Sequence, residues 1–257
     1  METQLDVRPS VSKVKVIKSD SLRILYYNAR SLVPKLDELS ATIEAHDFPD
    51  VVCIVESWLC HDIREQEIAI PNYNVFRHDR NRHGGGILLY VKDAYVTSEL
   101  PGTPTDLEII TICVQSGNCK ACLSLFYRPP SSSSVIFDNF CTYLESLNIA
   151  QYSHFILLGD FNVNFVNSSH PLYSKLCNIL STYCLSQIVT VYTVHHNGSS
   201  SIIDLVFLSN PASLPSCVTV PPSIQFRPQW TSHNTEMESY WQRSPLQQAS
   251  HLEVCLC

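Results

Sequence analysis

The sequence lacks any long hydrophobic run, since no apolar stretch approaches the ~20 residues that a membrane-spanning helix needs. The first 21 residues, METQLDVRPSVSKVKVIKSDS, also lack the apolar core of a signal peptide. Positive charge is scarce: 17 Lys and Arg stand against 24 Asp and Glu, which gives a formal net charge of −7. That balance argues against binding nucleic acid over the whole surface but leaves room for a local basic face. We expect a nuclear or cytoplasmic protein that is neither secreted nor bound to a membrane.

The eleven cysteines do not form the pattern of a secreted disulfide framework, because most of them fall inside apolar runs. Cys53 in DVVCIVES and Cys113 in IITICVQ read as small core residues. Cys119 and Cys122 form a CxxC with no second pair at zinc-finger spacing, so we expect no zinc site there.

The composition is that of a globular chain, with 45% hydrophobic and 16% charged residues among 257. Three regions are predicted: a flexible arm at 1–20, one domain at 21–222, and an irregular tail at 223–257. Within the domain, apolar patterning predicts strands at 22–27, 51–55, 73–76, 87–91, 107–114, 121–127, 155–158 and 202–208, and helices at 32–45, 134–149 and 173–183. Ser134 is expected to cap the second helix. Strands outnumber helices and some neighbours look antiparallel, which favours an α+β sandwich.

The segment HFILLGDFNVNF carries the most informative pattern in the chain. Phe155 to Leu158 is a short continuous apolar run, which predicts a strand buried on both faces. Gly159 predicts either a turn or a close approach of another part of the chain. If the chain stays extended, Asp160 and Asn162 point to the same side of the sheet.

Polar side chains also end several other apolar strands. They are Asn28 after LRILYY, Glu56 after VVCIV, and Tyr127 with Arg128 after LSLF, while Asp204 lies inside SSSIIDLVF. Ligand sites of layered α/β proteins gather where strand ends converge. Carboxylates and amides meeting there would form an oxygen-rich pocket suited to Mg²⁺ and a phosphate.

Each of these residues also has an ordinary explanation. A single Asp or Asn at a strand end is usually a turn residue or a cap, and Glu56 alone would most often be solvated. Asp204 is harder to explain in this way, because a buried carboxylate is costly unless it is paired or hydrogen-bonded. The combination therefore favours a functional site.

The motifs together resemble the exonuclease–endonuclease–phosphatase superfamily, and more narrowly the apurinic-endonuclease-like domain of LINE-type non-LTR retrotransposons. The resemblance covers about residues 22–210. It rests on YNARSL, ESWL, HDRNRHGGGILLYV, FYRPPS, LLGDFNVN and IIDLVF, in that order. It implies a four-layered α/β/β/α sandwich of the deoxyribonuclease-I-like type with an irregular C-terminal tail.

The resemblance also implies roles for individual residues. Glu56 corresponds to the main metal ligand, and the metal would be Mg²⁺, with Mn²⁺ as the alternative. The implied catalytic residues are Asn28, Tyr127, Asp160, Asn162, Asp204 and His233. Asn28 would position the catalytic groups, while Tyr127 and Asn162 would contact the phosphate. Asp160 would orient or deprotonate the attacking water, and Asp204 would orient the catalytic histidine, His233. DNA is the implied partner, and no small-molecule cofactor is expected. The basic stretch beside GGG, with Arg77, Arg80 and Arg82, could contact DNA phosphates together with Arg128, although a solvated hairpin loop would also explain any one of these charges. The implied activity is a nick that leaves a 3′-hydroxyl and a 5′-phosphate.

The chain departs from the superfamily at its closing Ser-Asp-His motif, where it offers only Thr231-Ser232-His233-Asn234. A missing aspartate implies weakened activity, because such catalytic groups act as a unit. Two alternatives to a nicking endonuclease therefore stay open. One is an inactive relic or DNA-binding module that keeps the fold, and the other is a phosphatase acting on a soluble phosphoester.

Overall fold

Two six-stranded sheets form the centre of the computed structural model, which describes residues 22–116, 119–190, 192–196, 199–209, 217–220 and 249–254. The first sheet contains, in spatial order, β13 (Cys217–Val220), β14 (Ala249–Val254), β1 (Leu22–Asn28), β2 (Val51–Val55), β4 (Ile87–Lys92) and β3 (Tyr73–His78). The second contains β5 (Val96–Glu99), β6 (Glu108–Ser116), β7 (Cys119–Tyr127), β8 (His154–Asp160), β12 (Asp204–Leu208) and β9 (Ser186–Gln187). Both sheets are mixed: β1–β2 and β7–β8 are parallel pairs, and the other neighbouring strands are antiparallel.

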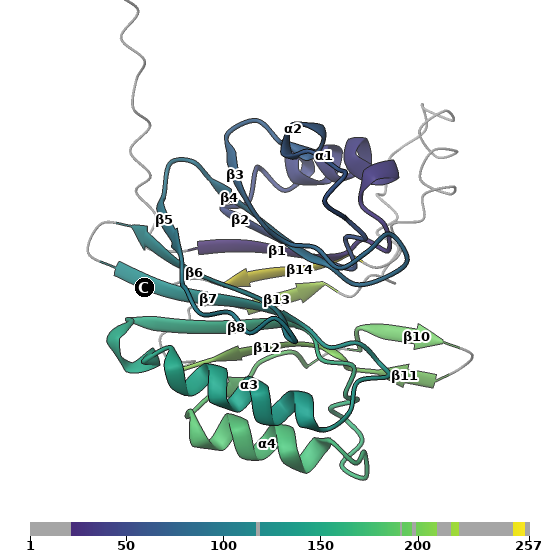
Figure 1. Ribbon diagram of the computed structural model, residues 1–257, viewed down its shortest axis with the longest axis vertical. Coiled ribbons are helices and arrows are strands. Elements are labelled where there is room, and N and C mark those ends of the chain that lie inside the picture. Colours follow the sequence, from purple (N-terminus) through teal and green to yellow (C-terminus); the bar gives the residue numbers. More distant parts are fainter. Residues whose placement is uncertain are drawn as a thin grey trace, which may run out of the picture.

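Helices cover the outer faces of both sheets. They are η1 (Val33–Lys35), α1 (Leu36–Ala45), α2 (Glu65–Ile68), α3 (Val135–Ser146), η2 (Ile149–Gln151) and α4 (Tyr173–Thr182). In Figure 1, α1 and α2 lie above the first sheet, while α3 and α4 lie below the second. A small hairpin of β10 (Val194–His196) and β11 (Ser199–Ser201) projects beside the sandwich. The expected α/β/β/α layering is therefore confirmed.

The layers follow from the alternation of side chains along the strands. In β2, Cys53 belongs to the core between the two sheets, whereas its neighbours Val52 and Ile54 belong to the core under α1. All five residues of β2 are buried, as its unbroken apolar sequence predicts. Leu39 and Ile43 of α1 complete the outer core.

Most of the expected elements are present, with some differences at their ends. Ser134 directly precedes α3, but its side chain makes no capping hydrogen bond, so the predicted cap is wrong. His195 and His196 lie in β10. Within the tail predicted at 223–257, residues 249–254 form β14, which pairs with β1 from Leu22↔Val254 to Tyr27↔Ala249.

Gly159 marks the closest approach between two strands of the second sheet. It lies opposite Phe126 in the parallel β7–β8 pair and has φ +145°. A Cβ at this position would lie 1.8 Å from the Phe126 carbonyl oxygen. Of the two expectations for Gly159, the close approach is the one that the structure bears out.

Two further expectations concern membranes and cysteines. Within the described ranges, no helix is long and apolar enough to cross a membrane. Cys53 is a buried free thiol, as expected of a core residue, whereas Cys113, for which the same was expected, is only partly buried.

Candidate active site

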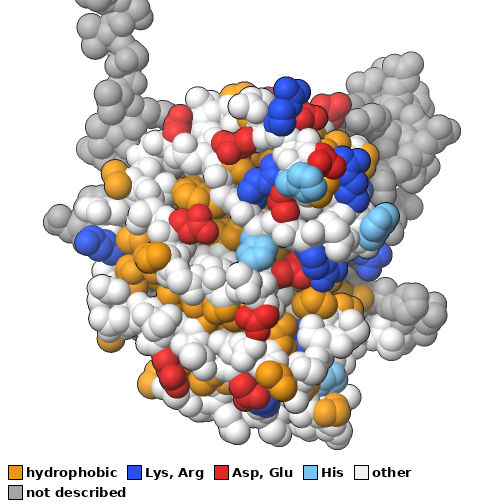
Figure 2. All heavy atoms as spheres, viewed as in Figure 1, with side chains coloured by type: hydrophobic (Ala, Val, Ile, Leu, Met, Phe, Trp, Pro, Cys, Tyr) orange, Lys and Arg blue, Asp and Glu red, His pale blue; other side chains and the backbone are white. Residues whose placement is uncertain are grey.

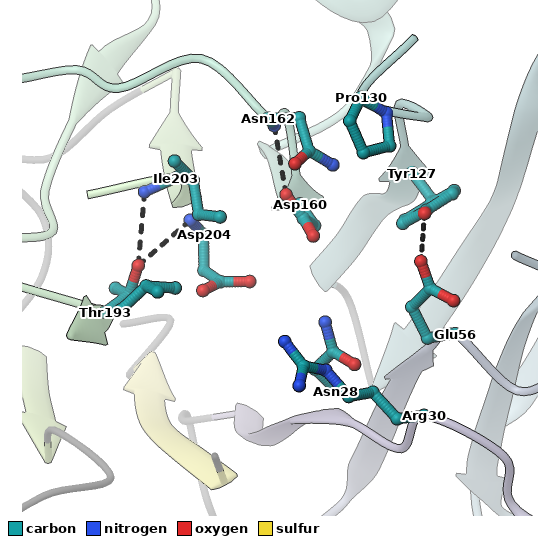
Figure 3. Close-up of a pocket in the computed structure, with 11 residues that line it drawn as sticks. Asn28, Arg30, Glu56, Tyr127, Pro130, Asp160, Asn162, Thr193, Ile203 and Asp204 are labelled. Carbon is teal, nitrogen blue, oxygen red and sulfur yellow. Dashed lines mark hydrogen bonds between the residues drawn. The ribbon is translucent and has the colours of Figure 1, made fainter. Parts of the chain in front are cut away.

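A cavity of about 160 Å³ opens where strand ends of the two sheets converge. It is lined by Asn28, Arg30, Glu56, Tyr127, Pro130, Asp160, Asn162, Thr193, Val194, Ile203 and Asp204 (Figure 3). That volume is well above the ~10–15 Å³ needed for one water. The structure thus brings together six of the seven residues that the sequence predicts as catalytic or metal-binding.

Strand register explains why these distant residues meet. Tyr127 pairs with Asp160 across β7–β8, and Asp160 pairs with Asp204 across β8–β12. Paired residues on neighbouring strands present their side chains on the same face. In the first sheet, Asn28 pairs with Val55, so Asn28 lies beside Glu56, the next residue along the chain.

The Glu56 carboxylate is held by three donors. Gly85 N donates to Oε2 at 3.0 Å, Trp58 Nε1 donates to the same oxygen, and the Tyr127 hydroxyl donates to Oε1. Burial, and then the hydrogen bond to Glu56, raises the pKa of Tyr127, so the phenol keeps its proton and remains a donor. Glu56 itself has φ 56°, a left-handed conformation that is uncommon for a glutamate.

Behind Glu56 lies a second, supporting group of contacts that the sequence patterns did not predict. Glu108 Oε2 accepts from Gly86 N at 2.6 Å, and Glu108 Oε1 accepts from Arg80 Nη1 at 2.7 Å. The Arg80 guanidinium carbon lies 5.7 Å from the centre of the Tyr127 ring. Glu108 and Arg80 therefore fix the glycine loop and the ring that hold Glu56.

Asp160 and Asp204 form a tightly coupled acidic pair. Asp160 is only 5% exposed, and burial, followed by the charge of Asp204, raises its pKa well above the usual range. Burial also raises the pKa of Asp204, although the Tyr26 hydroxyl donates to its Oδ1 at 2.7 Å and opposes the rise. A carboxylate whose pKa is raised is a stronger base than an ordinary aspartate, which suits it to taking a proton.

Asn162 reaches the cavity by a different route from the expected one. The strand β8 ends at Asp160, and Asn162 has φ 49°, so the chain does not stay extended through this segment. Instead, Asp160 Oδ1 accepts from Asn162 N at 3.0 Å, which forms an Asx turn. The Asn162 side chain donates through Nδ2 to Arg128 O at 2.7 Å.

The chemistry of the donors fits a hard divalent cation. Asn28 Oδ1 is buried and accepts no hydrogen bond from the described residues, although it lines the cavity near Glu56. Mg²⁺ binds through one or two protein oxygens together with water and phosphate oxygens. Within the described ranges, no cluster of three or more His, Cys, Asp or Glu could hold a metal. Glu56 and Asn28 are the residues that could hold the ion.

The four arginines predicted to contact DNA differ in their surroundings. Arg128 is only 3% exposed, and its guanidinium donates to Ser132 O at 2.7 Å. Arg77 pairs with Asp79, and Arg80 pairs with Glu108. Arg82 has an exposed side chain that lies 3.4 Å from Asp62. Lys, Arg and His side chains gather at the upper right of Figure 2, with acidic side chains among them.

Two other residues bear on the catalytic assignments. His233 lies outside the described residues. Arg30 was not predicted as a site residue, yet it lines the cavity. Its sequence signal is its place in the YNARSL motif, two residues after Asn28 at the end of a strand.

Comparisons with known proteins agree with this fold. The endonuclease domain of TRAS1, a telomere-specific non-LTR retrotransposon, is 12% identical with a TM-score of 0.64, over 91% of this chain and 98% of that one. An AP endonuclease from Archaeoglobus fulgidus is 14% identical with a TM-score of 0.60, over 91% and 97%. A 3′-5′ exonuclease from Neisseria meningitidis is 14% identical with a TM-score of 0.62, over 90% and 98%. At such identities the likeness establishes the fold.

No curated protein sequence matches the chain significantly. The model of the Endonuclease/Exonuclease/phosphatase family matches residues 25–232, which is most of the chain and includes the cavity residues. The fold, the cavity and this match agree with the resemblance read from the motifs. The chain belongs to the Endonuclease/Exonuclease/phosphatase family, whose members cleave phosphoester bonds.

Proposed function

We propose that this chain is a Mg²⁺-dependent DNA endonuclease domain derived from a non-LTR retrotransposon, and that it nicks DNA to leave a 3′-hydroxyl and a 5′-phosphate. The observation that carries the proposal is the meeting of Glu56, Asp160 and Asp204 with Asn28 in one cavity. The likeness to the TRAS1 endonuclease domain supports the retrotransposon origin.

In this proposal the residues take the roles that the resemblance implies for them. Glu56 and Asn28 hold the metal, which supplies positive charge to the phosphate when it is bound. Asp160 takes a proton from the attacking water, a role that its raised pKa favours. The Asn162 amide, which uses one Nδ2 hydrogen on Arg128 O, donates the other to a phosphate oxygen as negative charge grows there. The Tyr127 hydroxyl, which donates to Glu56 Oε1 in the structure, would turn to a phosphate oxygen in the same way. Asp204 orients His233, which serves as the acid or base.

Nicking of supercoiled plasmid tests the proposal. The purified protein should convert plasmid to open circles with Mg²⁺ but not with EDTA. Glu56→Gln and Asp160→Asn should each slow nicking by at least about 100-fold, the usual cost of losing a group that stabilises the transition state. Glu65→Gln, an exposed acid of α2, is the matched control and should nick normally.

A measurement of metal binding distinguishes two reasons for a lack of nicking: a wrong assignment of the metal site, and a correct site in an inactive protein. Without DNA, Mn²⁺ titration followed by electron paramagnetic resonance should show one site in the wild type and a weaker one in Glu56→Gln. Metal and DNA binding without nicking would identify an inactive relic. Hydrolysis of inositol phosphates in preference to DNA would identify a phosphatase. Unchanged nicking by Glu56→Gln would refute the site assignment.

A further inference from the structure

Among the described residues that line the acidic cavity, one is a cation, Arg30. The guanidinium of Arg30 is exposed, and it makes no hydrogen bond or ion pair with the described residues. Figure 3 shows it beside Asn28, pointing into the space between Asp204 and Glu56. The arginines at positions 77, 80 and 128 donate to the protein's own oxygens, so Arg30 differs from them.

The backbone that carries Arg30 is held in an unfavourable conformation. Arg30 has φ 41° and Ser31 has φ 79°, left-handed values that cost a non-glycine residue roughly 1–2 kcal/mol each. Strain of this kind persists only where the surroundings impose it, and it is concentrated at functional sites. Glu56 and Asn162, which also line the cavity, have positive φ as well.

Three sets of contacts impose the conformation of this loop. Ala29 N donates to Val55 O, and Ser31 N donates to Glu56 O, each at 2.9 Å. Lys35 Nζ donates to the carbonyl oxygens of Ala29 and Arg30. The loop is thereby hydrogen-bonded to Glu56, the proposed metal ligand, so the backbone of Arg30 is held in place at the edge of the cavity.

The charges of the cavity residues indicate a function for the Arg30 guanidinium. Among the described residues that line the cavity, Glu56, Asp160 and Asp204 are acidic and Arg30 alone is basic. If all three acids are ionised, their charge exceeds that of one divalent ion, and an incoming phosphate would meet a negative field. The positive charge of Arg30 already acts on both aspartates, since it lowers the pKa of each against the effect of burial.

We propose that Arg30 is a catalytic residue that binds a non-bridging oxygen of the phosphate being cleaved. Its planar guanidinium presents paired N–H donors that match phosphate oxygens, which a lysine cannot reproduce. This inference rests on the proposed function of the cavity and adds the phosphate-binding cation to it.

Substitution of Arg30 tests the inference in the nicking assay. Arg30→Ala should slow nicking by about 100-fold, as expected for the loss of one charged donor to the transition state. Guanidinium ion added at millimolar concentration should restore part of the rate to Arg30→Ala while leaving the wild type unchanged, and Arg30→Lys should be intermediate. Arg64→Ala, an arginine whose side chain is 78% exposed beside α2, should nick normally. Both alanine variants should keep the wild-type circular dichroism spectrum.

Binding of inorganic phosphate gives a readout that does not need cleavage. In calorimetric titration with Mg²⁺ present, the wild type and Arg64→Ala should bind phosphate, and Arg30→Ala should bind it at least tenfold more weakly. Equal phosphate affinity of Arg30→Ala and wild type would overturn the inference, and so would absence of phosphate binding by the wild type. If the wild type binds phosphate but nicks no DNA, the proposed function fails, while the phosphate titration alone decides the role of Arg30.

Discussion

Asp160 and Asp204 lie opposite each other on adjacent strands, and each is buried enough that its pKa is raised. Folding therefore moves both carboxyls into a place where the ionised form is disfavoured. A carboxyl whose pKa is higher in the folded than in the unfolded chain favours folding at low pH. That contribution is lost as the pH rises from the ordinary aspartate value through the raised one. The acidic pair thus lowers stability at neutral pH.

Replacing one of these acids should stabilise the metal-free protein. Asp160→Asn keeps an oxygen that can accept from Asn162 N but removes a buried charge. We expect a higher Tm than wild type at pH 8 in EDTA, by about 2–4 °C for each kcal/mol gained. The difference should narrow as the pH falls towards about 4, the ordinary aspartate pKa, because both proteins are then neutral at this site.

The control for this prediction is Asp93→Asn, which changes an exposed aspartate and should leave Tm unchanged at both pH values. A Tm for Asp160→Asn below that of wild type at pH 8 would show that the Asp160 carboxylate stabilises the fold. The variant should also lose nicking, so stability and activity are expected to change in opposite directions at this residue.

At the level of elements, the site depends on how tightly β7 and β8 pack. Asp160 follows Gly159 directly, and Tyr127 follows Phe126, so the contact between Gly159 and Phe126 sets the spacing of two cavity residues. No side chain fits between them, because the Phe126 carbonyl occupies the place of a Cβ.

Gly159→Ala should therefore destabilise the protein by more than about 3 kcal/mol, since backbone would have to move in a packed sheet. Gly102→Ala is the matched control: Gly102 also has positive φ, at +88°, but nothing lies within 4 Å of its Cβ position. That control should cost only about 1 kcal/mol, the usual difference due to backbone conformation. Urea unfolding measures both changes, and similar losses for the two variants would contradict the steric explanation.

Sequence patterns predicted the central strands because these are continuous apolar runs; β2 matches its predicted bounds residue for residue. They did not predict β5 and β9, which are the edge strands of the second sheet. Neither of these two strands contains a buried residue, and Val96 of β5 is 73% exposed, so they leave no apolar pattern to detect.

The cavity could be predicted in part for a similar reason. Polar residues that end apolar strands stand out in the sequence, as Glu56 and Asp160 do, and so does Asp204, a carboxylate inside an apolar run. Arg30 lies in a loop, and the ion pair between Arg80 and Glu108 joins residues 28 positions apart in sequence. Such contacts form only when the strands assemble into sheets, so local sequence patterns do not predict them.

At the scale of the whole molecule, the two ends of the described chain meet in one sheet. β14, formed by residues 249–254, pairs with β1 on one side and with β13 on the other. Without β14, β1 would keep only β2 as a partner, and β13 would keep none among the described strands. The region after Pro222, which has an irregular composition, therefore contains a strand, β14, that completes the first sheet.

Truncation tests how far the fold depends on this segment. A protein ending at Pro222 should unfold at a lower temperature than the full chain and should aggregate, because removal of β14 leaves the backbone groups of β1 as an open sheet edge. Removal of residues 1–20, which the sequence predicts to be a flexible arm, is the control and should leave Tm unchanged. Differential scanning calorimetry and size-exclusion chromatography measure both effects. If the protein ending at Pro222 stays monomeric and unfolds at the wild-type temperature, the domain is complete without β14, and its pairing with β1 contributes nothing to stability.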